Sequence, residues 1–594
     1  MPLTFAQDGT VSSWDVRKIA VIGPGIVGMP MAALLAHAGL RLDEPHPPRV
    51  LVVQRNSATS GWKVAAINAG RSPIGGVEPD LDRIVAESVA AGLLSASHDP
   101  ADLADADVIL VCTQTDKRGI EPDYGPLFEA LEGVTRALRQ RPPGNVPLVV
   151  FESTLAPSSM ATVVRDFFAR HGLVEGRDVL LGNSPNRVMP GRLVERVASA
   201  DKIVGGLHPA TPELIRRLYG RIVTRGTLHP TNSLTAEVVK TLENAYRDVR
   251  IAYSAEVARF CDARDVDFYA VRDAVNDRLA QRDAASHDPN AVPSGGLLVP
   301  TVGVGGHCLP KDGILLWWRG LEAGADTSRS LILEARRIND ESPAETIALA
   351  ERVDGPLDGK TVALLGTAYR FNSEDTRNSP TLALARLLKA RGCTVRLHDP
   401  YVPPRDQNLA RFGLAGDFTQ DVAAAVGDAE VLIFCTAHRD YAEGRAALFA
   451  AAPAARAVVD ACNLFARADV PAALAYTGIG RGTAAPAPAL LDAVEEGFRR
   501  VERGLANELA GVIDFLNARY ADDGFNRVSL DEVRRLAGTC VTGCDIAAPG
   551  PVGATPLGAG FEPRLVRVAR GEMPAGAVPA VAAELAEAEA AAAG

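Results

Sequence analysis

The sequence predicts an α/β protein in which two Rossmann-like, doubly wound domains are joined by a long central helix and followed by a C-terminal extension. Short apolar strands that each run into a glycine-rich or polar turn occur in the first part of the chain and again after residue 360. A long stretch with an apolar period near 3.6 residues separates the two series. A chain of 594 residues is also too long for one core. We expect domains at residues 1–220, 221–350, 351–482 and 483–594.

The composition excludes several classes of partner. A net charge of -11 argues against a nucleic-acid backbone, and the first residues lack the charged and apolar regions of a signal peptide. No apolar run is long enough to cross a bilayer, so we expect a cytoplasmic protein without a membrane partner. The 8 cysteines lack metal-ligand spacing, which predicts reduced thiols and no metal site.

The first strand leads into a dinucleotide fingerprint. A short buried-strand pattern at residues 18–22 precedes the run Gly23-Pro24-Gly25-Ile26-Val27-Gly28, and a helical pattern follows. The first glycine permits the turn, the second lets a pyrophosphate approach the backbone, and the third packs helix on strand. The helix N-terminus adds amide dipoles that attract phosphate. This context predicts an NAD(P) site at residues 23–28.

The next strand, residues 49–53, bears on the choice of cofactor. An acidic residue at its end would hold the ribose hydroxyls of NAD, but Gln54 and Arg55 stand there instead. Gln54 could still bond the ribose, whereas Arg55 could bind a 2′-phosphate. The residues alone leave NAD and NADP open.

Polar residues follow two further strands of the first domain. Thr115 follows the strand at 106–112, and Glu152-Ser153-Thr154 follows the strand at 146–151. In a doubly wound sheet such residues lie at the carboxyl ends of strands and face the ligand crevice. They could alternatively cap the helices that follow.

A long helix is predicted from Ser233 to about Phe260 by its apolar period. Lys240 and Asn244 stand four residues apart on it and therefore share one face. They are either a functional pair or part of a solvated stripe. A helix of this length suits the spine between two domains and a subunit interface.

The second half repeats the strand-turn architecture without the full glycine fingerprint. This predicts a second Rossmann-like domain that binds a different nucleotide. Beyond residue 483 an Ala/Pro linker precedes an amphipathic helical pattern at 490–519, and the Ala/Glu-rich residues 578–594 are expected to be disordered. The residues assign no chemistry to this extension. Strands are expected near residues 360–365, 394–398, 430–435 and 457–460, with a helix at 381–390.

One run between the two halves contains a candidate nucleophile. Gly303 to Asp312 places Cys308 after paired glycines and before Lys311. A buried cysteine is usually an inert hydrophobe, whereas a nucleophilic one needs a cationic, partly open surrounding. The run fits the second description better, but by itself it leaves both interpretations open.

Six motifs in a fixed order resemble one enzyme family over roughly residues 17–482. Together they resemble the UDP-glucose/GDP-mannose dehydrogenase family. This resemblance implies a UDP-sugar substrate, NAD as cofactor and a homodimer. The motifs are Gly23–Gly28, Glu152-Ser153-Thr154, Lys240-Thr241-Leu242-Glu243-Asn244 with Arg247, Gly305-Gly306-His307-Cys308-Leu309-Pro310-Lys311-Asp312, Gly366-Thr367-Ala368-Tyr369-Arg370, and Asp375-Thr376-Arg377-Asn378-Ser379-Pro380.

The resemblance also implies a reaction in which the C6 hydroxyl of the sugar becomes a carboxylate in two hydride transfers. Cys308 would trap the aldehyde as a thiohemiacetal, whose oxidation gives a thioester. Lys240 and Asn244 would stabilise the oxyanion at C6, while Asp312 would act with Thr154 and a water in proton removal. The implied cofactor residues are Gly23, Gly25, Ile26, Val27, Gly28, Gln54, Arg55, Thr115, Thr154, Lys311 and Arg377. The implied substrate residues are Asn186, Arg187, Lys240, Asn244, Arg247, Gly305, Gly306, Tyr369 and Arg370.

Two further sequence features bear on which sugar is the substrate. His307 and the run at 187–191 resemble the branch that acts on UDP-N-acetylhexosamines, which implies UDP-N-acetylglucosamine or UDP-N-acetylmannosamine rather than UDP-glucose. Three residues depart from the family. Asn186 stands where a Glu tied to thioester hydrolysis is usual, Gln54 replaces the ribose acid, and Cys462 replaces an Arg that contacts the UDP-sugar across the dimer.

The sequence alone leaves three other functions open. UDP-glucose 6-dehydrogenase activity is one alternative. Asn186 suggests a second, a two-electron dehydrogenase that releases an aldehyde or ketone with one reduced cofactor. A third is a non-catalytic nucleotide-sugar-binding protein that uses the extension for regulation, although such a protein has no need of the Cys308 thiol.

Overall fold

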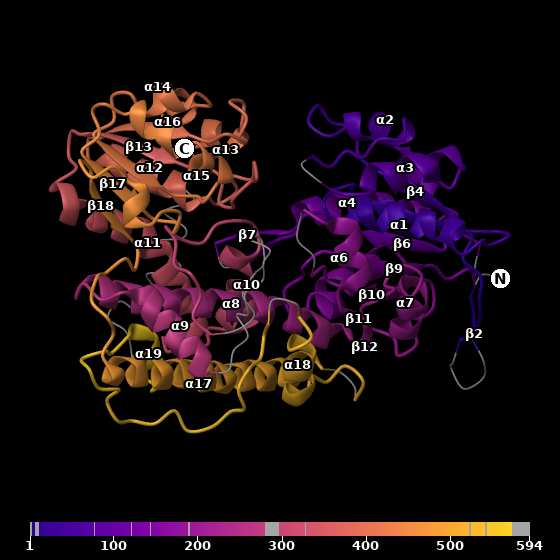
Figure 1. The fold of residues 1–594 in the computed structure, drawn as a ribbon. Helices are drawn as coiled ribbons and strands as arrows, with labels where there is room; N and C mark the ends of the chain where they lie inside the picture. The colour runs from indigo at the N-terminus through magenta and orange to yellow at the C-terminus, as the bar shows by residue number, and fades with distance from the viewer. Residues whose placement is uncertain are drawn as a thin grey trace. The chain divides into compact units, whose positions relative to one another are not determined.

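The computed structural model describes residues 3–5, 11–75, 78–119, 121–142, 144–187, 191–279, 296–326, 328–521, 524–540 and 543–572. The chain forms two compact units (Figure 1). The first unit comprises Met1–Glu243, Leu315–Ala323 and Ala510–Gly543, and the second comprises the remaining residues. Three helices have residues in both units: α8 (Ser233–Asp262), α10 (Leu309–Glu322) and α17 (Pro488–Tyr520). The four domain boundaries expected from the sequence stay a prediction.

The first unit is built on an eight-stranded sheet. Its strands are β3 (Lys18–Ile22), β4 (Arg49–Val53), β5 (Leu94–Ser97), β6 (Val108–Val111), β9 (Leu148–Phe151), β10 (Leu180–Asn183), β11 (Lys202–Gly206) and β12 (Leu228–Asn232). Their order is β12-β11-β10-β9-β6-β3-β4-β5, and neighbours are parallel except β10 and β11. The strand order reverses at β3, so the loops after β3 and β6 flank the switch point where ligands bind.

Helices cover both faces of this sheet (Figure 1). One face packs against α1 (Gly28–Arg41), α2 (Trp62–Asn68), α3 (Leu81–Ala90), α6 (Leu193–Ser199) and α7 (Thr211–Tyr219). The other face packs against α4 (Gly125–Leu138), α5 (Arg165–Arg170) and the short helices η1 (Pro100–Leu103) and η2 (Met160–Val164). The predicted doubly wound domain is therefore confirmed. Two small antiparallel pairs lie outside the sheet: β1 (Leu3–Phe5) with β2 (Val11–Trp14), and β7 (Asp116–Arg118) with β8 (Glu121–Asp123).

The second unit contains a six-stranded, all-parallel sheet. In spatial order its strands are β15 (Phe418–Thr419), β14 (Thr394–His398), β13 (Thr361–Leu365), β16 (Val431–Phe434), β17 (Ala457–Asp460) and β18 (Ala475–Gly478). One face packs on α11 (Leu331–Asp354), α12 (Pro380–Ala390) and α13 (Gln407–Arg411), and the other on α14 (Val422–Val426), α15 (Arg439–Glu443) and α16 (Arg445–Ala450). Two short helices, η3 (Ala415–Asp417) and η4 (Arg467–Asp469), complete it. This confirms the second Rossmann-like domain.

The central helix and the extension are helical as predicted. α8 begins at Ser233, and the amphipathic pattern of the extension forms the single helix α17. The remaining helices are α9 (Phe268–Arg278), α18 (Leu530–Ala537) and α19 (Arg564–Ala569). Residues 578–594, expected to be disordered, lie outside the described residues. Within the described ranges, no helix combines the length and the apolar character that crossing a membrane requires.

In the second unit, the extension packs on α8 through buried and partly buried polar contacts. Tyr253 donates its hydroxyl to the carbonyl of Val494 at 2.7 Å. Glu256 accepts the backbone N–H groups of Arg564 at 2.6 Å and Leu565 at 3.1 Å. Burial raises the pKa of Glu256 to about 7.

We expect Glu256 to make the stability of the fold depend on pH. Its folded pKa lies above its ordinary value of 4.5, so the folded state binds more protons than the unfolded state between those two pH values. The free energy of unfolding should therefore fall as pH rises through this window. Thermal unfolding at pH 5 and pH 8 checks this. Glu256→Gln should reduce the pH dependence, whereas the matched change Glu562→Gln, which alters another carboxylate of the extension, should leave it as in the wild type. Equal pH dependence in wild type and Glu256→Gln would contradict the expectation.

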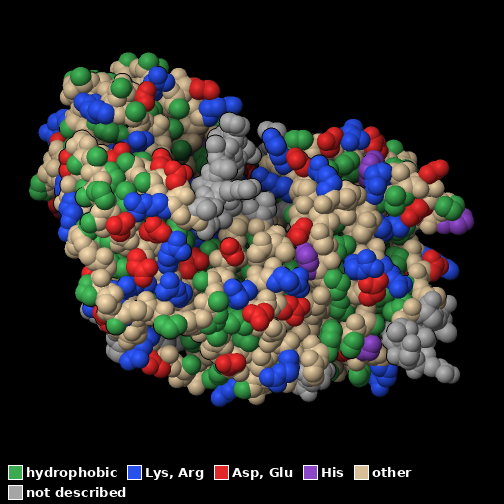
Figure 2. Space-filling view, turned by 60° about the horizontal axis from the view of Figure 1, so that its bottom comes forward, with side chains coloured by type: hydrophobic (Ala, Val, Ile, Leu, Met, Phe, Trp, Pro, Cys, Tyr) green, Lys and Arg blue, Asp and Glu red, His purple; other side chains and the backbone are tan. Residues whose placement is uncertain are grey.

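Charged side chains of both signs are interspersed on the face shown in Figure 2. A nucleic-acid surface would instead gather Lys and Arg into a basic patch or stripe. That nucleic acid is not a partner, as the net charge of -11 indicates, stays a prediction.

Candidate active site

The glycine fingerprint forms a tight turn between β3 and α1. Gly23 has φ +88°, and a Cβ on Gly28 would lie 2.2 Å from the carbonyl oxygen of Gly23. A Cβ on Gly25 would meet nothing within 4 Å, so this glycine borders open space. α1 has no acidic residue in its first turn and no side-chain cap. These residues fit a pyrophosphate held by the helix N-terminus.

The two residues after β4 are already engaged with neighbouring side chains. Gln54 donates its amide to the hydroxyl of Ser60 at 3.0 Å. Arg55 pairs with both carboxylate oxygens of Glu129 on α4, at 2.6 and 2.9 Å. Lys63 reaches the carbonyl of Pro24 in the fingerprint at 3.5 Å, and burial lowers its pKa. The Arg55–Glu129 pair places a carboxylate where a 2′-phosphate would need a free cation, which favours NAD over NADP.

We expect Glu129→Gln to relax this preference. Removing the carboxylate frees the Arg55 guanidinium and removes a negative charge that would repel a 2′-phosphate. Because both side chains are exposed, the effect should be moderate: NADP affinity should rise about fivefold with NAD affinity unchanged. Titration calorimetry with each dinucleotide measures this. Glu132→Gln on the same helix, which alters a carboxylate facing His171, is the matched control. Unchanged NADP affinity in Glu129→Gln would contradict the assignment.

The loops after β6, β9 and β10 are bonded to one another. Thr115 is buried and donates its hydroxyl to the carbonyl of Thr154 at 2.6 Å. Asn186 donates its backbone N–H to the carbonyl of Glu152 at 3.2 Å. The Glu152 carboxylate is buried and accepts hydrogen bonds from Lys202, at 2.7 Å, and from the Tyr219 hydroxyl. The structure thus brings Thr115, Thr154 and Asn186 together at the carboxyl edge of the sheet.

Arg187, on the same loop as Asn186, has a side chain that is only 4% exposed and forms an ion pair with Glu243. Residues 188–190 of the predicted sugar-specificity run lie outside the described residues. The proposed substrate contact of Arg187 stays a prediction.

In the second unit, Cys308 directly precedes α10 and is partly exposed. Its carbonyl accepts the backbone N–H groups of Lys311 at 3.2 Å and Asp312 at 3.0 Å. The Asp312 carboxylate is fully buried, and its two oxygens accept hydrogen bonds from Lys311 Nζ at 2.6 Å and from Asn244 Nδ2 at 2.5 Å. The first turn of α10 therefore joins the Lys311 ammonium and the Asp312 carboxylate to the Asn244 amide of α8, and its backbone is bonded to the carbonyl of Cys308.

The glycines before Cys308 pack against the loop that follows β13. A Cβ on Gly305 would lie 2.4 Å from the Cβ of Tyr369, and a Cβ on Gly306 would lie 2.9 Å from the Tyr369 ring. Burial raises the pKa of Tyr369 to about 12. Gly306 also donates its N–H to the carbonyl of Arg377 at 2.8 Å. A side chain at either glycine would displace Tyr369, which explains the paired glycines.

The remaining residues that the motifs single out are partly or fully buried. Lys240 lies one turn before Asn244 on α8 and is partly buried. Arg247 and Arg370 are also partly buried. Arg377 pairs with Asp375 at 2.6 Å, and this hydrogen-bonded contact raises its pKa. Cys462 is buried, and burial raises the pKa of its thiol well above the ordinary value.

Sequence reasoning missed a buried pair that orders the Tyr369 loop. Asp399, at the end of β14, accepts the backbone N–H groups of Thr367 at 2.7 Å and Ala368 at 2.9 Å. His438 donates Nε2–H to the same carboxylate at 3.0 Å and accepts the N–H of Asn372 at Nδ1. Hydrogen bonds from His438 and the backbone hold the pKa of Asp399 below its usual value despite burial, which opposes them. The sequence could have indicated Asp399 as a candidate residue, because it lies at the carboxyl end of a predicted strand.

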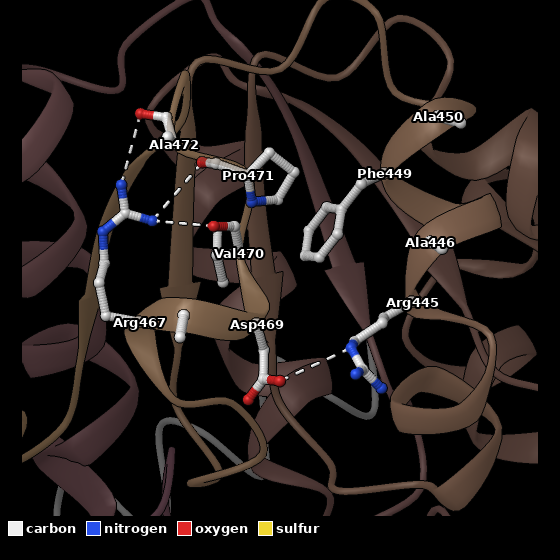
Figure 3. A pocket seen from close by; sticks show the side chains of 10 residues that line it. Arg445, Ala446, Phe449, Ala450, Arg467, Asp469, Val470, Pro471 and Ala472 are labelled. Carbon is white, nitrogen blue, oxygen red and sulfur yellow. Dashed lines mark hydrogen bonds and ion pairs between the residues drawn. The ribbon is translucent and has the colours of Figure 1, made fainter.

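A separate cavity of about 840 Å³ lies beside α16 and η4 (Figure 3). Arg445 approaches Asp469 at 3.6 Å across it, while Arg467 donates to the carbonyls of residues 470, 471, 472 and 474. None of its lining residues is a predicted site residue. The cavity is therefore distinct from the residues that the motifs single out.

Comparisons with known proteins show the family of this chain. The UDP-glucose/GDP-mannose dehydrogenase family has three domain models, and all match: the NAD binding domain at residues 17–223, the central domain at 234–341 and the UDP binding domain at 363–467. The chain belongs to this family. Its members are NAD-dependent nucleotide-sugar dehydrogenases, so the enzyme class and the cofactor predicted from the motifs are confirmed for this dehydrogenase.

Similar proteins include enzymes that act on N-acetylated sugars. UDP-N-acetyl-D-mannosamine dehydrogenase of Pyrococcus horikoshii is 30% identical over 78% of this chain and 99% of its own length. NDP-N-acetyl-D-galactosaminuronic acid dehydrogenase of Ralstonia nicotianae is 28% identical over 72% of this chain and 92% of its own length. Among solved structures, the NDP-N-acetyl-D-galactosaminuronic acid dehydrogenase of Methanosarcina mazei has a TM-score of 0.64 at 31% identity, covering 79% of this chain and 96% of its own.

Proposed function

We propose that this dehydrogenase oxidises the C6 hydroxyl of a UDP-N-acetylhexosamine, UDP-N-acetylmannosamine or UDP-N-acetylglucosamine, to the uronate in two steps through a covalent intermediate on Cys308. The observation that carries the proposal is the first turn of α10, where Asp312 is bonded to the carbonyl of Cys308 and to the Asn244 amide. The names of the relatives support an N-acetylated sugar.

The residues of the second unit supply the covalent chemistry. The Cys308 sulfur adds to the C6 aldehyde, giving a thiohemiacetal; loss of a hydride from C6 and of a proton from its hydroxyl gives a thioester, and water cleaves the C–S bond to release the carboxylate and the thiol. NAD, when bound, accepts one hydride in each of the two oxidations. Cys308 is partly exposed, unlike the buried Cys261, Cys393, Cys435, Cys462 and Cys544, which agrees with a role as nucleophile.

Asn244 and Lys240 stabilise the negative charge that develops on the C6 oxygen. One Asn244 N–H is directed to Asp312, which fixes the amide and leaves its second N–H for the oxyanion. Lys240 projects from the same face of α8 one turn earlier and adds an ammonium. The buried Asp312 carboxylate acts in proton removal, and the role of Thr154, which belongs to the first unit, stays a prediction.

Thioester hydrolysis requires a base other than Glu152 or residue 186. Residue 186 is an asparagine. Glu152 and Asp312 are both buried and paired, but of these two carboxylates Asp312 is the one whose backbone N–H binds the carbonyl of Cys308, and we assign the hydrolytic step to it as well.

Cofactor reduction against a panel of UDP-sugars tests the proposal. UDP-N-acetylmannosamine, UDP-N-acetylglucosamine, UDP-glucose and UDP-galactose are compared with NAD, and the acid product is quantified by mass spectrometry. We expect two reduced cofactors and one uronate per sugar consumed, with an N-acetylated sugar preferred. One reduced cofactor per turnover with release of an aldehyde would instead establish the two-electron alternative, and binding without cofactor reduction would establish the non-catalytic one.

A further inference from the structure

The C-terminal extension reaches one of the loops at the carboxyl edge of the first sheet. Residues beyond 467 lie outside the three family models, yet residues 510–543 belong to the first compact unit together with the NAD-binding sheet. Asn232, at the end of β12, donates its amide to the carbonyls of Phe525 and Arg527, both at 2.9 Å. Thr231 donates to Glu532 on α18 at 2.9 Å. The segment around α18 is thus docked by specific polar contacts.

The C-terminal end of α18 binds the guanidinium of Arg187. Arg187 donates from one nitrogen to the carbonyl of Leu536 at 2.8 Å and from another to the hydroxyl of Thr539 at 2.9 Å. Thr539 in turn donates its hydroxyl proton to the same carbonyl at 2.6 Å. A helix C-terminus carries partial negative charge, so it suits a cation. Leu536, Thr539 and Arg187 are called here the α18 clasp.

The α18 clasp holds the residue that follows Asn186 in its loop. The loop is also held before Asn186, at Ser184, which donates its hydroxyl to the carbonyl of Ile203 at 2.7 Å and accepts Lys202 Nζ at its own carbonyl at 2.9 Å. Asn186 lies between these two anchors, with its N–H on the carbonyl of Glu152. Movement of Arg187 would therefore move the residue beside it that is expected to contact the sugar.

Burying the charged Arg187 side chain without these hydrogen-bond partners would cost free energy. Its side chain is 4% exposed, and Glu243, its ionic partner, is equally buried. A buried guanidinium that loses an acceptor retains its desolvation cost without the compensating bond. Loss of the Thr539 hydroxyl should therefore shift Arg187 rather than leave it in place.

We propose that Thr539 is a positioning residue for the nucleotide-sugar site, acting through Arg187 on Asn186, and that the extension is thereby an integral part of this enzyme's substrate-binding loop. The inference rests on the proposed function, because the loop is a sugar-binding loop only if this enzyme oxidises a nucleotide sugar. It assigns a role to a segment in which the motifs show no chemistry.

Thr539→Val and Thr539→Ser separate the hydroxyl from the shape of the side chain. In Thr539→Val the KM for the best sugar of the panel should rise about tenfold, with the KM for NAD unchanged, because one hydrogen bond to a charged group is lost. Thr539→Ser retains the hydroxyl and should restore the wild-type KM. The matched control is Thr555→Val, which removes a hydroxyl that Arg500, another buried arginine, contacts at 3.2 Å within the second unit.

Hydrogen exchange supplies a readout that needs no substrate. The amide of Asn186 should exchange about tenfold faster in Thr539→Val than in the wild type, and at the wild-type rate in Thr555→Val. Wild-type exchange in Thr539→Val would overturn the clasp, and an unchanged sugar KM despite faster exchange would overturn its positioning role. If the wild-type enzyme converts no sugar, the proposed function fails, while the exchange rates still decide whether the α18 clasp holds the loop.

Discussion

Cys308→Ala is expected to abolish acid formation from the nucleotide sugar, lowering the rate by about 1,000-fold or more. Without the thiol no thiohemiacetal forms, so the aldehyde is not converted to a thioester. At most one reduced cofactor per sugar should then appear. Counting reduced cofactor and uronate in the same reaction measures both effects. Mass spectrometry of the wild-type protein quenched during turnover should show a sugar adduct on Cys308.

The control for this substitution is Cys393→Ala, which removes a buried cysteine of the second unit. The Cys393 thiol donates to the carbonyl of Leu357 at 3.1 Å, and burial raises its pKa. Cys393→Ala should therefore keep the wild-type stoichiometry, even if packing makes it less stable. Acid formation by Cys308→Ala at the wild-type rate would exclude the covalent route and would leave oxidation of a free aldehyde hydrate, with the second NAD as hydride acceptor, as the alternative.

The fold was predictable because its signals are local. β3, β4, β14 and β17 have the bounds that short apolar runs indicate, and α8 begins at Ser233 where the helical period begins. Buried parallel strands bounded by turn residues leave few alternatives. The fingerprint glycines were equally predictable, because a strand, a G-x-G-x-x-G run and a helix follow each other directly.

The contacts that organise the site were not predictable, because they join residues far apart in sequence. Nothing in the local pattern pairs Arg55 with Glu129, or Arg187 with Thr539. The extension illustrates this: its helical period predicted α17, but the docking of α18 on β12 depends on side chains from two distant segments. Asp399 stood at a strand end where ligand contacts are expected, and it instead binds the backbone of the Tyr369 loop.

A second large effect is expected from Asp312→Asn, which should lower kcat about 100-fold to 10,000-fold. The two Asp312 oxygens accept from Lys311 and Asn244, so an amide at this position would direct its NH₂ group at one of these donors. Donor would then face donor in a fully buried place, and the Asn244 amide would lose the partner that orients it. The charge that we assign to proton removal would also be gone. Steady-state kinetics with the preferred sugar measures the loss, and acid formation should fall with it.

Loss of a buried carboxylate also destabilises the protein, and Asp248→Asn separates that effect from catalysis. Asp248 is buried in the same unit and accepts from Arg336 and Asn339, both at 2.8 Å, but it is not a predicted site residue. Both variants should lower the thermal unfolding midpoint, because each leaves a buried cation with a neutral partner. Only Asp312→Asn should lower kcat at a temperature where both remain folded. An equal loss of kcat in the two variants would mean that Asp312 acts through stability alone, whereas a loss confined to Asp312→Asn would place its carboxylate in the reaction.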